Sequence, residues 1–117
     1  MKKNKLGTSD LEISRICLGT MTWGEQNNQD EAFAQMEYSI EKGINFFDTA
    51  EMYSIPGNKK TVGSTEKIIG NWLEETGNRK HVFLSTKVVG KGVAYVRNGP
   101  DFSKEQINKA IDGSLKR

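Results

Sequence analysis

The stretch INFFDTAEMY, residues 44–53, begins as a nearly continuous apolar run and ends with a carboxylate and a tyrosine. A strand that is buried on both faces has this pattern, which is typical of parallel sheets covered by helices. We therefore expect a buried strand over residues 44–48, with Asp48 at its carboxyl end. Functional side chains gather at this end of the strands in parallel α/β folds. The stretch thus makes Asp48 and Tyr53 candidate site residues.

Three other segments have the spacing of amphipathic helices. They cover residues 28–42, a segment from 64 or 65 to 76, and a segment that starts after 103. The predicted cap and stop residues are Asn28 and Gly43 for the first, Ser64 or Thr65 and Gly77 for the second, and Ser103, in a capping box with Gln106, for the third. The third helix is expected to place Ile107, Ala110, Ile111 and Leu115 on one apolar face.

Short strands are expected over residues 16–18 and 82–88, in addition to the strand at 44–48. The turn cluster GTSD, residues 7–10, predicts a hairpin near the start of the chain. The order of elements is therefore a hairpin followed by three strand–helix pairs. Such alternation gives parallel strands joined by right-handed crossovers, so the predicted fold class is α/β.

The charge balance excludes several classes of partner. The 117 residues include 17 basic and 15 acidic side chains, which are interleaved and give a net charge of +2. No basic stripe predicts nucleic-acid binding, and no apolar run predicts a membrane span or a secretory signal. A single cysteine, Cys17, excludes an intramolecular disulfide and fits a reducing cytoplasm. Because apolar residues flank it, we expect Cys17 to be a small buried side chain.

The sequence ends at SLKR, within the third predicted helix. A sheet of three parallel strands leaves both of its edges unpaired. We therefore expect residues 1–117 to be part of a larger domain. The alternative is a self-contained unit whose open strand edges pair with a second copy or with a missing half supplied by another chain.

Common signatures of catalytic and binding sites are absent from the sequence. It has no GxGxxG, no GxSxG, no paired CxxC and no metal-ligand spacing of His, Cys or carboxylates, so no metal site is predicted. A glycine follows the lysine of the GKG stretch, residues 90–92, where a phosphate loop requires Ser or Thr. The chemistry must therefore come from other residues.

A triplet remains: Asp48, Tyr53 and Lys87, which stands at the end of the next strand. Neighbouring strands lie about 4.8 Å apart, so the side chains of Asp48 and Lys87 are able to pair at one rim of the sheet. An ammonium group about 4 Å from a phenolate stabilises it by roughly 4 kcal/mol at an effective dielectric constant of 20. Such a phenol suits proton donation to a carbonyl oxygen. The alternative is an ordinary ion pair covered by a tyrosine.

Four stretches together resemble the aldo-keto reductases, and most closely their bacterial Tas-type branch. They are LGTMTWGEQN (18–27), INFFDTAEMY (44–53), IIGNWL (68–73) and LSTKV (84–88). Members of this family are (β/α)8 TIM barrels that use NADPH to reduce aldehydes and ketones. The resemblance implies that residues 1–117 are the N-terminal part of one such barrel domain, formed by the hairpin and the first three βα units.

The resemblance also implies roles for individual residues. Tyr53 resembles the general acid, and Lys87 and Asp48 resemble the residues that tune it. Gly19, Thr20 and Met21, together with Asp48, resemble the residues that lie against the cofactor nicotinamide and the substrate. Trp23 either lines the substrate pocket or packs within the fold. The family's catalytic histidine and its groups for the adenosine phosphate belong to later strands, and His81 starts its strand about 20 Å from Lys87.

The expected function is therefore reduction of a small carbonyl compound by hydride transfer, with the 117 residues inactive by themselves. The alternative is a non-catalytic interaction subunit that resembles the barrel-type β subunits of potassium channels.

Overall fold

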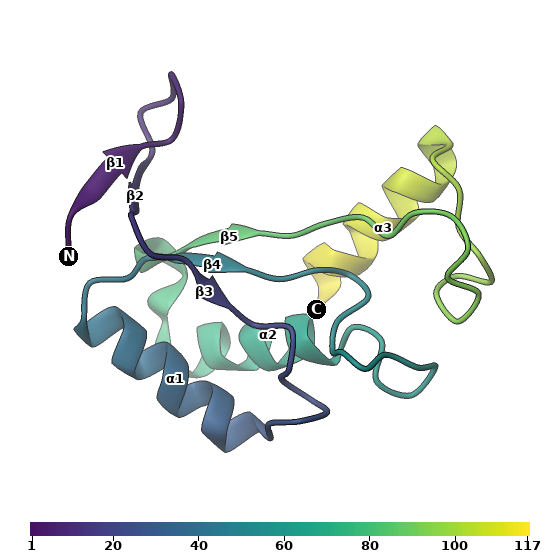
Figure 1. Cartoon of the computed structure of the whole chain (residues 1–117), viewed down its shortest axis with the longest axis horizontal. Helices are drawn as coiled ribbons and strands as arrows, with labels where there is room; N and C mark the ends of the chain where they lie inside the picture. Colours follow the sequence, from purple (N-terminus) through teal and green to yellow (C-terminus); the bar gives the residue numbers. More distant parts are fainter.

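A short antiparallel hairpin opens the chain, as the turn cluster predicts. The structure is a computed structural model that describes residues 1–117, and in it β1 (Lys3–Lys5) pairs with β2 (Glu12–Ser14). The hairpin stands beside the rest of the molecule (Figure 1). Asn45 fastens it there, because its side-chain oxygen accepts a hydrogen bond from Ser14 N (2.7 Å) and its amide donates to Glu12 O (3.0 Å).

Three parallel strands form the central sheet in the order β3-β4-β5. These are β3 (Leu18–Gly19), β4 (Phe46–Asp48) and β5 (Phe83–Ser85), and all are shorter than the sequence predicts. The register places Gly19 opposite Asp48 and Asp48 opposite Ser85, so the strands end together. The outer strands β3 and β5 each have one edge without a partner strand. The α/β prediction is confirmed.

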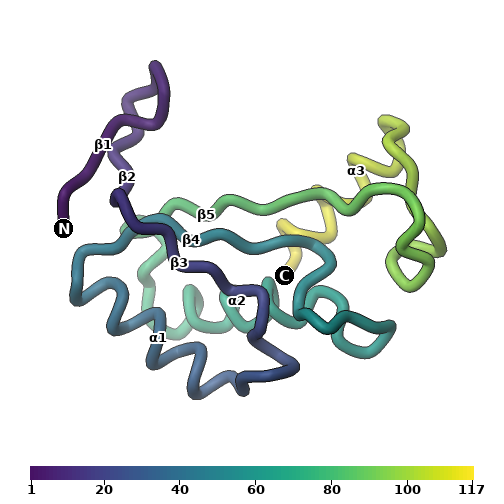
Figure 2. The backbone as a smooth tube through the Cα atoms, viewed as in Figure 1, coloured from purple at the N-terminus to yellow at the C-terminus, as the bar shows by residue number.

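Two helices cover one face of this sheet, α1 (Gln29–Glu41) and α2 (Ser64–Thr76) (Figures 1 and 2). A 3-10 turn, η1 (Asn78–His81), leads from α2 into β5. Gly43 and Gly77 have φ angles of +78° and +67°, which suit the stop positions that the sequence predicts. The predicted cap of α2 is wrong by one or two residues: Gly63 holds that position, and the side-chain cap is missing.

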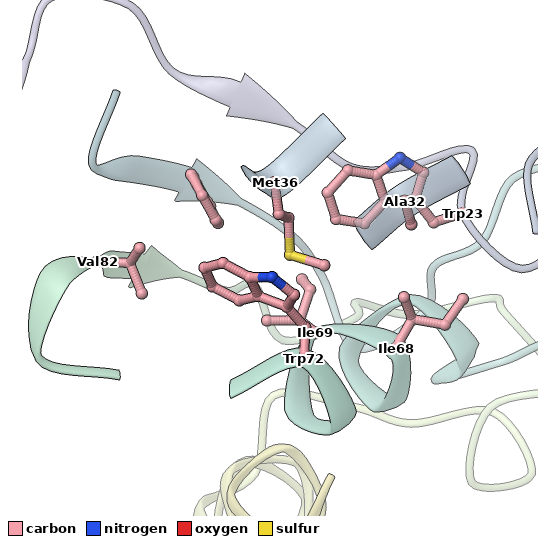
Figure 3. Packing of buried hydrophobic residues seen from close by; sticks show 8 residues of the cluster. Trp23, Ala32, Met36, Ile68, Ile69, Trp72 and Val82 are labelled. Carbon is pink, nitrogen blue, oxygen red and sulfur yellow. The ribbon is translucent and has the colours of Figure 1, made fainter. Parts of the chain in front are cut away.

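The core lies between the sheet and these two helices (Figure 3). Its largest side chains are Trp23, Trp72, Phe47 and Met36, all fully buried. The rings of Phe47 and Trp72 pack at 6.0 Å between centroids. The indole N–H groups reach polar partners at the edge of the core, since Trp72 donates to Glu37 (2.7 Å). The core therefore fixes β4 on α2.

Burial of β4 on both faces is contradicted by the structure. Only Phe47 is fully buried, whereas residues 44, 45, 46 and 48 are half-buried. Alternate residues face opposite sides of a strand, and helices cover only the side to which Phe47 points. The same geometry corrects the prediction for Cys17, whose side chain is exposed because it precedes the inward-facing Leu18.

The last helix, α3 (Lys104–Lys116), begins beyond β5 at the far end of the molecule and runs back toward α2, where Arg117 pairs with Glu66 (Figure 1). Ser103 caps it by accepting a hydrogen bond from Gln106 N. The reciprocal half of the predicted capping box is missing, because the Gln106 side chain binds Arg97 instead. The predicted apolar face of α3 is mostly exposed to solvent: Ala110 is buried, but Leu115 is 81% exposed. None of the helices has the length and hydropathy that crossing a bilayer requires.

The N-terminus of α1 provides a first testable prediction. Asn28 and Glu31 form a complete capping box, with reciprocal 2.9 Å hydrogen bonds to each other's backbone N–H. Replacing Asn28 with Ala removes the acceptor of the Glu31 N–H, so we expect the free energy of unfolding to fall by about 1 kcal/mol. Denaturant unfolding measures this change. Asn108→Ala on the exposed surface of α3 is the control, and equal stability of both variants would contradict the prediction.

Candidate active site at the carboxyl ends of the strands

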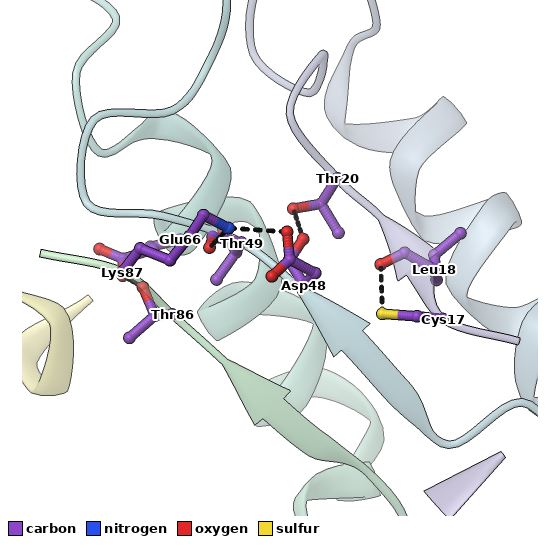
Figure 4. Close-up of polar contacts among 8 residues, drawn as sticks. All are labelled: Cys17, Leu18, Thr20, Asp48, Thr49, Glu66, Thr86 and Lys87. Atoms are coloured by element: carbon purple, nitrogen blue, oxygen red, sulfur yellow. Dashed lines mark hydrogen bonds and ion pairs between the residues drawn. The ribbon is translucent and has the colours of Figure 1, made fainter. Parts of the chain in front are cut away.

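An ion pair joins the ends of β4 and β5. The Lys87 ammonium donates a 2.7 Å hydrogen bond to Asp48 Oδ2 and a 2.6 Å hydrogen bond to Thr49 O (Figure 4). The two charged side chains remain 46% and 39% exposed, so the pair is open to a molecule approaching the rim. This arrangement follows from the register, because the parallel strands bring Asp48 and Ser85 level and Lys87 lies just beyond.

Tyr53 lies in the loop that follows β4 and turns back toward this pair. A turn at its base is closed by the hydrogen bond from Tyr53 N to Ala50 O (3.1 Å). The Lys87 Nζ atom lies 4.9 Å from the centroid of the Tyr53 ring. The structure thus brings the three candidate residues together, although they are far apart in the sequence.

The surroundings of Lys87 keep its side chain protonated. Partial burial lowers the pKa of Lys87, but hydrogen bonding and charge attraction to Asp48 and Tyr53 outweigh this effect and raise the pKa above its ordinary value. The side chain is therefore an ammonium group at neutral pH. A fixed positive charge beside an aromatic hydroxyl stabilises negative charge that develops on that hydroxyl.

The residues after β3 lie next to the pair on its other side. Thr20 is fully buried, and both its N–H (3.2 Å) and its Oγ1 (2.8 Å) donate to Asp48 O. Gly19 and Met21 are exposed. A Cβ atom added at Gly19 would meet no heavy atom within 4 Å, so the surface above this residue is open. Thr20 therefore anchors the strand end, while its two neighbours are accessible.

Trp23 and His81 lie away from the rim. The Trp23 ring is fully buried in the core and its Nε1 donates to Gln35 Oε1 (3.0 Å), which corresponds to the packing alternative. His81 ends η1, before β5 begins, and so lies at the opposite end of that strand from Lys87. This placement of His81 agrees with the position expected from the sequence.

Two buried glutamates near the rim were missed by the sequence analysis. Glu51 pairs with Arg97, and Glu66 pairs with Arg117 and accepts from the Thr86 hydroxyl (2.6 Å). Each arginine is far from its glutamate in the sequence. Glu51 lies within DTAEMY, between two candidate residues, and that position is the only signal that the sequence offers for it.

Comparisons with known proteins identify relatives of the chain. The chain is 40% identical to the protein Tas of Escherichia coli and 39% identical to the uncharacterised oxidoreductase YrpG of Bacillus subtilis, in both cases over its whole length. It covers 35% and 36% of these proteins, so it spans about a third of their length.

A solved structure with a similar fold is the holo form of the aldo-keto reductase AKR11C1 from Bacillus halodurans. The TM-score is 0.77 with 34% identity, over 99% of this chain and 36% of that one. The model of the aldo/keto reductase family matches residues 15–117. With the hairpin, the parallel sheet and its ordered rim, these matches show that the chain belongs to the aldo/keto reductase family of oxidoreductases.

Proposed function

We propose that the full-length protein reduces an aldehyde or ketone with NADPH, and that residues 1–117 provide its proton-donating group. In this proposal the chain is the N-terminal part of a single (β/α)8 barrel domain in the cytoplasm. The single cysteine suits such a reducing compartment. The observation that carries the proposal is the position of the Lys87 ammonium, which is hydrogen-bonded to Asp48 and 4.9 Å from the centroid of the Tyr53 ring.

The chemistry of these three side chains matches proton donation. When a carbonyl group is reduced, its oxygen becomes negatively charged and requires a proton. The Tyr53 hydroxyl donates that proton as a general acid, and the Lys87 ammonium stabilises the phenolate that remains. Asp48 and Thr49 O hold the ammonium in position through hydrogen bonds of 2.7 and 2.6 Å. Bound NADPH supplies the hydride.

The residues at the rim fit the nicotinamide end of such a cofactor. Gly19 leaves open surface at the end of β3, and Met21 is 47% exposed beside it. These two residues would lie against the ring, and the exposed Asp48 carboxylate faces the same rim. Thr20 would act through the backbone that it fixes, because its own hydroxyl is bonded to Asp48 O. The Trp23 side chain has no exposed surface for substrate and packs within the core.

The experiment that tests the proposed function is a reductase assay of the full-length protein. NADPH oxidation is followed by absorbance with a panel of small aldehydes and ketones, and NADH is supplied in parallel. We expect carbonyl-dependent oxidation that is faster with NADPH. Binding of NADPH without turnover of any carbonyl compound would favour the interaction-subunit alternative instead.

For residues 1–117 by themselves we expect no carbonyl reduction and no tight NADPH binding. Only the rim residues after β3, β4 and β5 are present, and the strand edges of β3 and β5 are open. Quenching of NADPH fluorescence measures binding, with the full-length protein as the control. Quenching by the 117-residue chain at micromolar concentrations would contradict this prediction.

The open edges also predict self-association of the isolated chain. Size-exclusion chromatography would disprove that association if the chain elutes as a stable monomer.

A further inference from the structure

A buried carboxylate supports the loop that carries Tyr53. The Glu51 side chain is 6% exposed and lies between Asp48 and Tyr53 in the sequence. Its backbone N–H donates to Lys87 O (3.1 Å), and its Oε2 accepts from Val89 N (3.1 Å). One residue therefore holds the chain after β4 against the chain after β5, at Lys87 itself and at Val89, two residues further on.

Arg97 neutralises this carboxylate. Its guanidinium forms an ion pair with Glu51 Oε1, and the Arg97 side chain is only 17% exposed. The Arg97 Nε also donates to Gln106 Oε1 (3.1 Å) in the first turn of α3. A buried charge without a partner is costly, so loss of either member of the pair would leave the other uncompensated.

The backbone at Arg97 and Asn98 has an unusual conformation. Arg97 and Asn98 have φ angles of +43° and +59°, in the left-handed region that residues other than glycine rarely adopt. Such a conformation persists where surrounding contacts determine it. Here a backbone hydrogen bond from Gly99 N to Val96 O (2.9 Å) closes the turn that contains both residues, and the Arg97 side chain adds its contacts with Glu51 and Gln106.

A second buried pair provides a natural comparison. Glu66 is as deeply buried as Glu51 and pairs with Arg117 at 2.7 Å. It joins α2 to the end of α3 and accepts a hydrogen bond from the Thr86 hydroxyl (2.6 Å), but it makes no hydrogen bond to the loop that carries Tyr53. Glutamine at position 66 keeps an acceptor for the Thr86 hydroxyl, so Glu66→Gln removes the buried charge alone. The effect of removing a buried charge should therefore appear at both glutamates, whereas only the change at Glu51 should loosen the contact between the Tyr53 loop and the chain after β5.

We propose that Glu51, held by Arg97, is a positioning residue that keeps the Tyr53 phenol and the Lys87 ammonium in register for proton donation. This inference rests on the proposed function. Glu51 is itself buried, so it acts through the two segments that it joins.

The test uses Glu51→Gln in the full-length protein. Glutamine retains the shape and an acceptor for Val89 N, but removes the charge that pairs with Arg97. Small misplacements of reacting groups lower the rate strongly, so we expect kcat to fall about tenfold or more while KM for NADPH stays within about twofold. The pH dependence of kcat should also shift, because it depends on the distance between the phenol and the ammonium.

Two further variants make the test specific. Glu66→Gln should lower the unfolding midpoint by about as much as Glu51→Gln does. Unlike Glu51→Gln, it should leave the pH dependence of kcat unchanged. Arg97→Gln should reproduce the Glu51→Gln profile, whereas Arg97→Lys keeps the charge and should recover part of the rate. If Glu51→Gln does not fold, the two Arg97 variants decide the question.

The outcomes separate this inference from the proposed function. Normal kcat and normal pH dependence in Glu51→Gln and Arg97→Gln would overturn the positioning role, as would equal changes in Glu66→Gln. Turnover that survives Tyr53→Phe would instead overturn the proposed function on which the inference rests.

Discussion

Tyr53→Phe in the full-length protein is expected to lower kcat by about 10²–10⁴-fold, the usual contribution of a general acid. The substitution removes one oxygen atom and keeps the ring, whose centroid lies 4.9 Å from the Lys87 ammonium. Folding and cofactor binding should therefore change little, and KM for NADPH should stay within about twofold. Steady-state kinetics with NADPH and a reactive aldehyde measure the effect.

Tyr38→Phe is the matched control for this prediction. Tyr38 lies on α1, is 61% exposed and is also close to a lysine, with Lys42 Nζ 4.9 Å from its ring centroid. The control variant should retain full activity, since this tyrosine lies away from the rim. Similar activity of Tyr53→Phe and Tyr38→Phe would refute the role proposed for Tyr53.

The elements that the sequence predicts best are those with a local cause. Asn28 caps α1, and Gly43 and Gly77 end α1 and α2, because each of these effects depends on a few neighbouring residues. The meeting of Asp48 with Lys87 follows from one further rule, that parallel strands end at the same rim. The sequence therefore predicts the arrangement of the rim as well as the fold class.

What the sequence does not predict depends on contacts between distant segments. Asn45 reads as part of an apolar run, yet its side chain bonds the hairpin at Glu12 and Ser14. Gln106 reads as half of a capping box, yet it binds Arg97. In both cases the local sequence pattern predicts one environment for the side chain, and the folded structure gives it a hydrogen-bond partner from another segment. The Glu51–Arg97 pair has no local pattern at all, so only the structure identifies it.

Burial is mispredicted for a related physical reason. The apolar pattern of residues 44–47 anticipates cover on both sides of the sheet, but the helices of this chain cover one side. The apolar face of α3 is likewise mostly exposed, as Leu115 shows. An apolar pattern in the sequence indicates that a segment is stable when it is buried, but it does not say whether an element of residues 1–117 covers that segment.

Lys87→Met is the second variant with a large expected effect, a fall in kcat of about 10²–10³-fold in the full-length protein. Methionine matches much of the length of the lysine stem but carries no charge, so the phenolate left after proton donation loses its stabilising neighbour. The Asp48 carboxylate also loses its 2.7 Å partner and remains as a negative charge beside the rim, which opposes the developing charge further. Kinetics over a range of pH measure both effects.

Asp48 makes this prediction sharper, because the two residues act as a unit. If Lys87 acts on Tyr53 and Asp48 acts on Lys87, then Asp48→Asn should lower kcat less than Lys87→Met, and the double variant should be no worse than Lys87→Met. Lys80→Met, in η1 at the opposite end of β5, is the control and should retain activity. Additive losses in the double variant would mean that Asp48 acts independently of the ammonium, and an active Lys87→Met would leave proton donation by Tyr53 without its electrostatic support.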